Sequence, residues 1–433
     1  MATPESRPIV AENTFENGSA LSDELLRQLI AVGQVDILVG LPTLNNASTI
    51  IDVVRAVHLC FTRDFPRLRT VLINSDGGST DGTPELIRGA SFTDEDVVQT
   101  SHSLRTLHRV VAPYHGLPGK HTALRTVFAA GELAQAKAVV VIDPNGPATR
   151  ADRVTELIGP ILRSDVELLA PRYRRHPRDG VLITQLVRPL VRALYGVALD
   201  EPLGAEFACS GRFASHCLEQ DIWNHEAVRF AIDLWLRTEA VAERFAVGQI
   251  WRPATTAAGT RTTLREAVHQ VMLSLIESLR AHESFWRKAG GIAELRTWGS
   301  DPVAVPDAAT WDYHALAEQA RHDIGEIRAL LEEVLEPDVF ARVLDDGAGG
   351  SAPLDDELWV RIVYAFAAAT RQGRTGVDQL ADMFAPLYMW RASAFMSHTA
   401  LESPAVVQAR LNSLCETFQR LKPVLVANWS AEV

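Results

Sequence analysis

The chain has 433 residues, and at about 150 residues per domain this length predicts two or three domains. Hydrophobic residues make up 47% of the chain and charged residues 22%, which excludes fibrous and wholly disordered classes. The 42 Lys and Arg against 54 Asp and Glu leave a formal net charge of -12, which would repel nucleic acid, so we expect no nucleic-acid partner.

The cysteines and the N-terminus point to a cytoplasmic protein. Four cysteines lie too far apart for a zinc cluster and are too few for a disulfide scaffold, so we expect reduced thiols at Cys60, Cys209, Cys217 and Cys415. No apolar run reaches the roughly 20 residues of a membrane span, and residues 1–18 are polar rather than a basic and then apolar signal. We therefore expect a cytoplasmic location and no membrane partner.

The first part of the chain alternates helical and strand-like patterns. A short helix is predicted from Ser22, a suitable cap, to Ile30, and Gly33 would end it. Apolar strand-like runs and helical stretches then follow one another over residues 35–41, 50–59, 68–74, 83–89 and 138–143. This alternation predicts an α/β fold, in which a mostly parallel sheet has helices on both faces.

From about Thr263 onward the pattern is helical, and we expect no strands there. One helical face is predicted around residues 324–334 and another around residues 406–421. The Gly-rich stretch from Asp345 to Asp356 predicts a mobile connection between helices. We divide the chain into an N-terminal extension (1–33), an α/β domain (34–262) and a helical C-terminal region (263–433).

Four segments follow predicted strands, at the sheet edge where open parallel sheets bind ligands. The first, residues 41–46, holds Pro42, Thr43 and Asn45, and is equally consistent with a plain turn. The second, residues 74–83, holds Asp76, an acceptor for a base or ribose, and Gly77, which lets a ligand approach the backbone. Its position directly after an apolar strand favours a functional role over that of a simple loop.

The other two segments supply opposite charges. Residues 115–120 end in Lys120 at the start of a predicted helix, a position suited to a phosphate, although a single lysine is more often a solvated surface residue. Residues 138–146 deliver Asp143 and Asn145 to the sheet edge, where Asp143 is a candidate ligand for a metal that bridges a diphosphate. Asp-Pro-Asn-Gly is also a strong turn signal, and spacing alone leaves both interpretations open.

In this order and spacing, the four segments resemble the nucleotide-sugar half of GT-A glycosyltransferases. The middle of the chain is similar to the retaining branch that contains mannosylglycerate synthase and glucosyl-3-phosphoglycerate synthase. That narrower resemblance is carried by Gly180, Thr184, the run 188–190, the Pro-Leu-Gly-Ala-Glu segment 202–206 and the segment 230–233. The resemblance covers about residues 35–252 well and the remainder loosely.

The resemblance implies roles for individual residues. Donor binding falls to Pro42, Thr43, Asn45, Asp76, Gly77, Lys120, Asp143 and Asn145; acceptor binding falls to Arg174, Gly180, Thr184 and Glu206; catalysis falls to Asp143, Asp233 and Arg252. It further implies transfer with retention, without a covalent enzyme nucleophile, so that the main physical task is to stabilise charge on the departing diphosphate.

The sequence departs from the family where that charge is handled. The family has a second acid where this chain has Asn145, and a metal-binding His where this chain has Arg252. An amide is a weak ligand for a hard cation, and a guanidinium does not coordinate metals, so Mg²⁺ or Mn²⁺ at Asp143 is in doubt. Our hypothesis is that Arg252 replaces the cation. The alternative is an alignment slip across residues 254–263, with the true ligand elsewhere, His269 being the nearest histidine.

A basic cluster and a set of C-terminal aromatic residues are two further candidates for function. The basic cluster Arg172, Arg174, Arg175, His176 and Arg178 either attracts an anionic acceptor or is a hydrated loop; the acidity of the rest of the chain favours the first interpretation. The aromatic residues Trp359, Phe366, Tyr388, Trp390 and Trp429 are predicted to be core residues without a catalytic role.

Together these observations predict a retaining hexosyltransferase. The donor would be UDP-glucose or GDP-mannose and the acceptor a small anion such as glycerate or phosphoglycerate, and we expect a homodimer. Two alternatives stay open at this point. One is a degenerate protein that binds a nucleotide sugar without turnover, and the other is a hydrolase or phosphorylase that uses the same donor.

Overall fold

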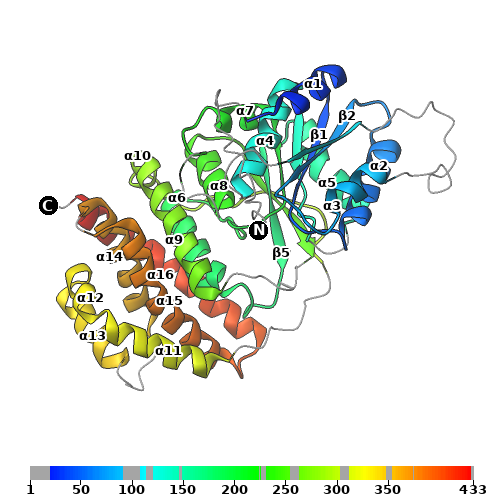
Figure 1. Cartoon of the computed structure of the whole chain (residues 1–433). Helices are drawn as coiled ribbons and strands as arrows, with labels where there is room; N and C mark the ends of the chain where they lie inside the picture. Colours follow the sequence, from blue (N-terminus) through cyan, green and yellow to red (C-terminus); the bar gives the residue numbers. More distant parts are fainter. Residues whose placement is uncertain are drawn as a thin grey trace, which may run out of the picture.

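A computed structural model describes residues 20–90, 108–113, 120–145, 149–223, 225, 231–253, 263–302, 312–347, 354–373 and 375–430; for 108–113 and 346–347 it describes the backbone alone. An α/β part and a helical part lie side by side and pack against each other (Figure 1). No helix in the described ranges is long and apolar enough to cross a membrane.

The α/β part is built on one sheet of eight strands in the order β3-β2-β1-β4-β6-β5-β7-β8. The strands are β1 (Ile37–Thr43), β2 (Thr70–Asp76), β3 (His108–Pro113), β4 (Ala138–Val141), β5 (Leu168–Arg174), β6 (Phe207–Ser210), β7 (Val247–Pro253) and β8 (Thr297–Trp298). All neighbouring pairs are parallel except those of β6, which runs antiparallel to both β4 and β5. The predicted α/β fold class, a mostly parallel sheet with helices on both faces, is confirmed.

Helices cover both faces of the sheet because side chains along each strand alternate between the faces. Leu38 and Val139 pack on one face with α1 (Asp23–Val32), α4 (Lys120–Leu133), α7 (Gly211–Leu218) and α8 (Ile232–Ala242). Ile37 and Val39 pack on the other face with α2 (Ile50–Asp64), α3 (Thr83–Gly89) and α5 (Ala151–Leu162). As predicted, Ser22 caps α1 by accepting a hydrogen bond from the Leu25 amide, and Gly33 ends it.

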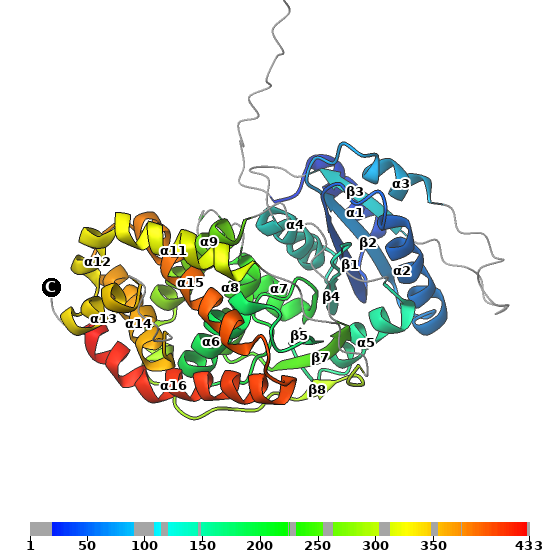
Figure 2. The ribbon, with the colours of Figure 1, turned by 90° about the horizontal axis from the view of Figure 1, so that it is seen from below.

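The helical part combines two helices that lie between β5 and β6 in the chain with the helices that follow β7. It consists of η2, a π-helix (Ile183–Val187), α6 (Arg188–Tyr195), α9 (Leu264–Ala281), α10 (Glu283–Trp286), α11 (Tyr313–Glu326), α12 (Arg328–Val334), α13 (Pro337–Gly347), α14 (Asp356–Gln372), α15 (Val377–Thr399) and α16 (Pro404–Ser430). In the turned view α16 runs along one side of the molecule and lies against α6 (Figure 2). This places the C-terminal helix beside the segment that the sequence assigned to the acceptor.

Several predicted boundaries need correction. The first two strands begin and end two residues later than predicted, and β4 ends at Val141 rather than at residue 143. The prediction of no strands after Thr263 is wrong, because β8 extends the sheet beside β7. The helical face around residues 324–334 is divided between α11 and α12, which meet at Ile327.

Two predicted features are confirmed and one lies outside the described residues. The four cysteines are unpaired and buried. Of the aromatic residues, Trp359, Phe366, Tyr388 and Trp429 lie in the core, and Trp390 packs against it. The predicted mobile connection at 345–356 falls largely on residues 348–353, which are outside the described residues.

Candidate active site

The carboxyl ends of β1 and β2 hold a buried carboxylate in a fixed orientation. Asp76 is 5% exposed and accepts hydrogen bonds from the Thr43 hydroxyl (2.9 Å), the Gly78 amide (3.0 Å), and the Ser79 amide (2.8 Å) and hydroxyl (2.6 Å). The Gly77 amide in turn donates to the Thr43 carbonyl (2.7 Å), and Pro42 lies beside Ser75 in the register of the two strands. These contacts fix the loop that follows β2, where the sequence predicted a nucleoside.

Asparagines connect this loop to the end of β4. The backbone amide of Asn45 donates to the Ser79 hydroxyl (2.8 Å), and the Asn46 side chain donates to the Asn145 side-chain oxygen (2.7 Å). The backbone amide of Asn145 then donates to the Asp143 carboxylate (2.9 Å). Asp76 and Asp143, at the ends of two different strands, are therefore linked through a chain of polar contacts.

Asp143 borders a small cavity between the sheet and α5. The cavity has a volume of about 30 Å³, room for about one water, and its lining includes Arg153, Tyr173, Glu206 and Arg252. Tyr173 and Arg252 are side by side in the register of β5 and β7. Two of the predicted catalytic residues, Asp143 and Arg252, thus reach the same cavity.

The guanidinium of Arg252 is already fully engaged. It is 3% exposed and donates through Nε to Glu206 (2.5 Å), through Nη1 to Glu156 (3.1 Å) and through Nη2 to the Arg153 carbonyl (2.8 Å). Two carboxylates therefore face this one cation, so a diphosphate could bind Arg252 only by replacing one of them.

Arg153 is a residue that the sequence analysis missed. Its guanidinium lines the same cavity, and within the described part of the chain it makes no hydrogen bond or ion pair. Burial, together with the nearby charge of Arg252, lowers the pKa of Arg153. Arginine stays charged at any physiological pH, so Arg153 presents a positive charge in the cavity that Asp143 borders, with Glu206 as a nearby counter-charge.

Lys120, at the start of α4, lies in a second group of charges. Its Nζ donates to Asp233 (2.5 Å) and to the Ala205 carbonyl (3.2 Å). Asp233 also accepts from Arg237 (3.2 Å), which is completely buried, and the pKa of Arg237 is lowered by that burial. One carboxylate thus serves two cations, and the group retains a positive charge. The segments that precede Lys120 and Asp233, residues 114–119 and 226–230, lie outside the described residues.

Three consecutive residues of the Pro-Leu-Gly-Ala-Glu segment join these two groups. The Gly204 carbonyl accepts from Arg237 (2.5 Å), the Ala205 carbonyl accepts from Lys120, and the Glu206 side chain accepts from Arg252. Gly204 is needed here, because a Cβ at this position would lie 2.2 Å from Pro171 Cγ in β5. The segment therefore fixes three cations relative to one another along the edge of the sheet.

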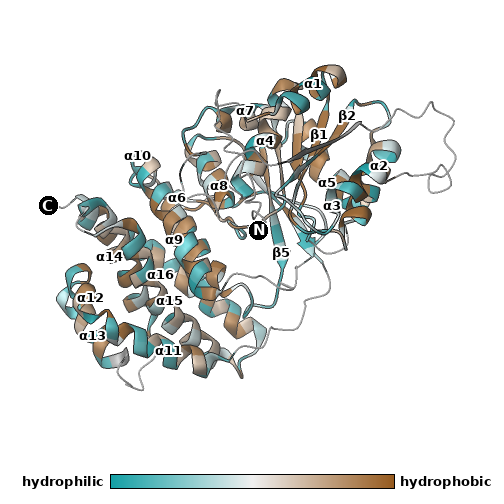
Figure 3. Ribbon diagram, in the orientation of Figure 1, coloured by the Kyte–Doolittle hydropathy of each residue, from teal (hydrophilic) through white to brown (hydrophobic). Residues whose placement is uncertain are grey.

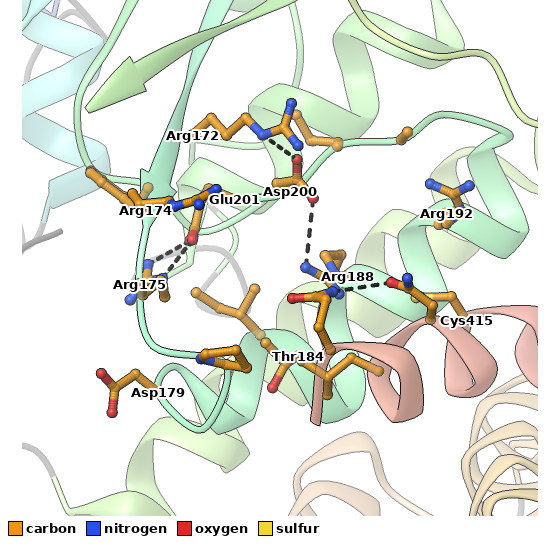
Figure 4. A pocket seen from close by; sticks show the side chains of 18 of the residues that line it. Arg172, Arg174, Arg175, Asp179, Thr184, Arg188, Arg192, Asp200, Glu201 and Cys415 are labelled. Carbon is orange, nitrogen blue, oxygen red and sulfur yellow. Dashed lines mark hydrogen bonds and ion pairs between the residues drawn. The ribbon is translucent and has the colours of Figure 1, made fainter. Parts of the chain in front are cut away.

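The residues predicted to bind an acceptor are divided between two places. Arg174 and Thr184 line an open groove of about 1010 Å³ between the end of β5, η2, α6 and α16 (Figure 4). Gly180 lies just before η2, and its φ of 63° suits a glycine. Glu206 lies at the small cavity, paired with Arg252. Tyr173 borders both the cavity and the groove.

The basic cluster is partly neutralised. Arg175 forms a two-fold hydrogen-bonded pair with Glu201 (2.6 Å for both contacts), and Arg174 pairs with Asp301 (3.1 Å). Arg172 pairs with Asp200 (2.8 Å) and stacks over the Trp251 ring at 4.4 Å. The end of β5 is accordingly hydrophilic, whereas β1 is mostly hydrophobic (Figure 3).

The side chains around Asp143 do not fit a resident divalent cation. Such a site needs several oxygen ligands, and here Asp143 is one, the Asn145 oxygen accepts from Asn46, and Arg252, which also lines the cavity, cannot coordinate a metal. Among the described residues that line the cavity, Asp143 is the only carboxylate without an ion pair. We therefore derive no step through a metal.

Comparisons with known proteins give structures but no family. No protein-family model and no curated protein matches the chain. A crystal structure of glucosyl-3-phosphoglycerate synthase from Mycobacterium tuberculosis in complex with phosphoglyceric acid is 22% identical, with a TM-score of 0.41, covering 62% of this chain and 86% of that chain. A further crystal structure of that M. tuberculosis enzyme is 23% identical, with a TM-score of 0.40, covering 60% of this chain and 85% of that chain.

A crystal structure described only as a mycobacterial protein is 22% identical, with a TM-score of 0.42, covering 59% of this chain and 78% of that chain.

Proposed function

We propose that the chain is a glycosyltransferase that moves a hexose from a nucleoside diphosphate sugar to a polar, anionic acceptor with retention of configuration. The observation that carries this proposal is the continuous set of contacts along the edge of the sheet, from Asp76 through Asn45, Asn46 and Asn145 to Asp143. In an open parallel sheet this edge is where a nucleotide is held.

The donor would lie along these contacts. Asp76 and the backbone that follows it would face the nucleoside, while the diphosphate and the hexose attached to it would extend toward Asp143. Two cations from different helices would serve the diphosphate: Arg153 lines the cavity that Asp143 borders, and Lys120 is connected to that cavity through the 204–206 segment. A diphosphate that departs with its bond electrons needs such charge, because stabilising it lowers the barrier to transfer.

In this proposal a metal ion is not required at the leaving group, because fixed Lys and Arg side chains supply the positive charge. Arg252 would hold Glu206 and thereby the segment that fixes Lys120, while Arg153 would face the diphosphate directly. Arg153 can clamp phosphate oxygens with two parallel hydrogen bonds, which a lysine cannot.

The experiment is to incubate the protein with UDP-glucose or GDP-mannose, with and without glycerate or phosphoglycerate, and to follow release of nucleoside diphosphate. Release that depends on the acceptor supports transfer. Release without the acceptor indicates hydrolysis instead, and thermal stabilisation by the nucleotide sugar without turnover indicates a binding protein.

A second arm repeats the assay with EDTA and then with added manganese or magnesium. Unchanged activity in EDTA is expected. Activity that EDTA abolishes and a divalent cation restores would refute the metal-free mechanism while leaving the transferase assignment intact. The anomeric configuration of the product, read by proton NMR, tests retention.

A further inference from the structure

The groove beside the candidate active site is too long for a three-carbon acid. It reaches from Tyr173 and Thr184, next to the proposed reaction centre, to Arg192 on α6. Thr184 and Arg192 are eight positions apart on η2 and α6, which at 1.5 Å per helical residue is about 12 Å. With bonds of about 1.5 Å, the carbon chain of glycerate spans only about 3–4 Å. The groove volume of about 1010 Å³ is at the upper end of the roughly 300–1,000 Å³ range of small-molecule sites.

The far end of the groove carries two arginines, Arg188 and Arg192, whose ion pairs are long, and one of them is with an exposed carboxylate. Arg172 and Arg188 share Asp200, with Arg188 at 3.6 Å, beyond hydrogen-bond distance, although its side chain is only 16% exposed. Arg192 faces Glu294 at 3.5 Å, but that carboxylate is 80% exposed and its charge is screened by water. Figure 4 shows Arg188 and Arg192 on the same side of the groove, away from Arg174 and Arg175.

The opposite wall is one face of α16. Its Gln408, Asn412, Cys415 and Gln419 recur at helical spacing along the groove, and the Gln408 side chain donates to the Asn412 side chain (3.1 Å). Amide side chains both donate and accept hydrogen bonds, which matches hydroxyl groups. Burial raises the pKa of Cys415, so its thiol remains neutral and does not compensate the arginines. Glu416 is the only acid that α16 brings to the described lining, and it is exposed.

We propose that the acceptor is an extended anion, a sugar acid or sugar phosphate of about disaccharide size, rather than a bare three-carbon acid. Its reactive hydroxyl would lie near Tyr173 and Thr184, its other hydroxyls along the amides of α16, and its carboxylate or phosphate at Arg188 and Arg192. This inference rests on the proposed function, because the proposed reaction centre decides which end of the acceptor lies near Tyr173 and Thr184. It adds the chemical class of acceptor that the groove would bind.

The test measures binding to the full-length protein by isothermal titration calorimetry. The probes are lactobionate, a disaccharide acid; trehalose 6-phosphate, a disaccharide phosphate; glycerate, a short acid; and lactose, which is neutral. Lactobionate or trehalose 6-phosphate is expected to bind at least about ten-fold more tightly than glycerate and lactose. Equal or tighter binding of glycerate overturns the proposal.

Variants locate the site. Arg192→Gln is expected to weaken binding of the disaccharide anion at least about ten-fold, and Asn412→Ala about three-fold, with glycerate changed by less than about two-fold. The matched control is Arg420→Gln, which removes an exposed α16 arginine that pairs with Glu357 outside the groove. An equal loss in Arg420→Gln, or no loss in Arg192→Gln, refutes the assignment. A separate titration with UDP-glucose tests the donor site, so failure of the proposed function is recognised independently of the groove result.

Discussion

At the scale of single residues, the site contains one arginine that is committed to the protein and one that faces the cavity. Arg252 is held by Glu206 and Glu156, whereas the Arg153 guanidinium makes no hydrogen bond or ion pair among the described residues. The two guanidinium groups lie close enough for the charge of Arg252 to lower the pKa of Arg153. A bound diphosphate would relieve that repulsion, because it brings negative charge to the cavity.

Replacing Arg153 is therefore predicted to impair catalysis more than folding. Charge-assisted hydrogen bonds contribute about 1.5–3 kcal/mol, so Arg153→Gln should lower acceptor-dependent release of nucleoside diphosphate by roughly ten- to a hundred-fold. The melting temperature should stay within about 2 °C, since the described structure shows no hydrogen bond or ion pair to lose. Arg150→Gln, which removes only an exposed pair with Asp152, is the control. Loss of activity in proportion to loss of folded protein would contradict this role.

Site residues that directly follow strands can be predicted from the sequence, whereas the side chains that pair with or surround them cannot. Asp76 and Asp143 could be found because each comes directly after an apolar run, and the ends of parallel strands meet at one edge. Arg153 could not, because it lies in the first turn of α5 and looks like any solvated helix residue. Nor could the pairing of Arg252 with Glu206 and Glu156 be predicted, since it joins residues 46 and 96 positions apart.

At the scale of elements, the η2 segment is held in place by two helices of the C-terminal region, α14 and α15. The Trp359 indole donates to the Gln185 carbonyl (2.8 Å), and Arg391 donates to the Gln185 side chain (2.9 Å). Arg391 is 6% exposed and also binds Asp356 (2.6 Å). A π-helix is rare and is frequently found at functional sites, and these outside contacts help to hold η2, which contains Thr184, in this conformation.

Loosening this contact is predicted to affect the acceptor and not the donor. Gln185→Ala removes the acceptor of the Arg391 bond, and we expect KM for the acceptor to rise about three- to ten-fold while the dissociation constant for the nucleotide sugar is unchanged. Gln185→Glu keeps an oxygen for Arg391 and should restore the acceptor KM. A parallel change in both constants would indicate a general loss of structure instead.

Lys422 connects α16 to α6 through a buried amine. Its Nζ donates to the carbonyls of Leu194 (3.3 Å) and Ala289 (2.6 Å), and burial lowers its pKa to about 8. The unfolded chain, with the ordinary lysine pKa of about 10.4, binds this proton over a pH range in which the folded chain has released it. The contribution of this group to the free energy of unfolding therefore increases as pH rises from about 8 to 10.4, and it is lost as pH falls through that range.

The prediction is tested with Lys422→Met, which lacks the titrating group. The difference in unfolding free energy, wild type minus variant, should increase by about 1–2 kcal/mol between pH 7.5 and pH 9.5, as measured by urea denaturation. Lys288→Met, at an exposed position near the end of α10, serves as the control and should show a smaller increase. A difference that is constant or falls with pH would show that Lys422 keeps its proton in the folded protein.

Some elements were predictable and others depended on tertiary contacts. α1 and α3 follow their local signals, since a cap residue or a glycine marks an end and apolar side chains share one face. The break at Ile327 has no local signal, because the apolar spacing continues through it. The two-residue strand β8 has none either, because it forms only by pairing with β7. η2 has no sequence signal comparable to that of an α-helix, and its contacts come from residues about 170 to 210 positions away.

At the scale of the whole molecule, the boundary predicted at residue 262 does not separate two hydrophobic cores. The largest buried cluster combines Ala170 of β5, Leu186 of η2 and Leu234 of α8 with the helices of the C-terminal region, including Trp359 and Phe418. Sequence patterns assign each element to a class, but they do not show which apolar faces meet. The helical part thus completes the core of the α/β part on the side that carries the groove.

This shared core predicts that the molecule unfolds as one unit. Trp359 is fully buried and contacts residues on both sides of the boundary predicted at residue 262, since it packs on Phe384 and Tyr388 and donates to the Gln185 carbonyl. Replacing a buried tryptophan with alanine costs about 3–5 kcal/mol, so Trp359→Ala should shift a single calorimetric transition to lower temperature while its shape is preserved. Two transitions in the wild type, of which the variant moves only one, would show that the α/β part folds independently. In that case the groove would be an interface between two separately stable bodies, because loss of the helical part would leave the sheet intact.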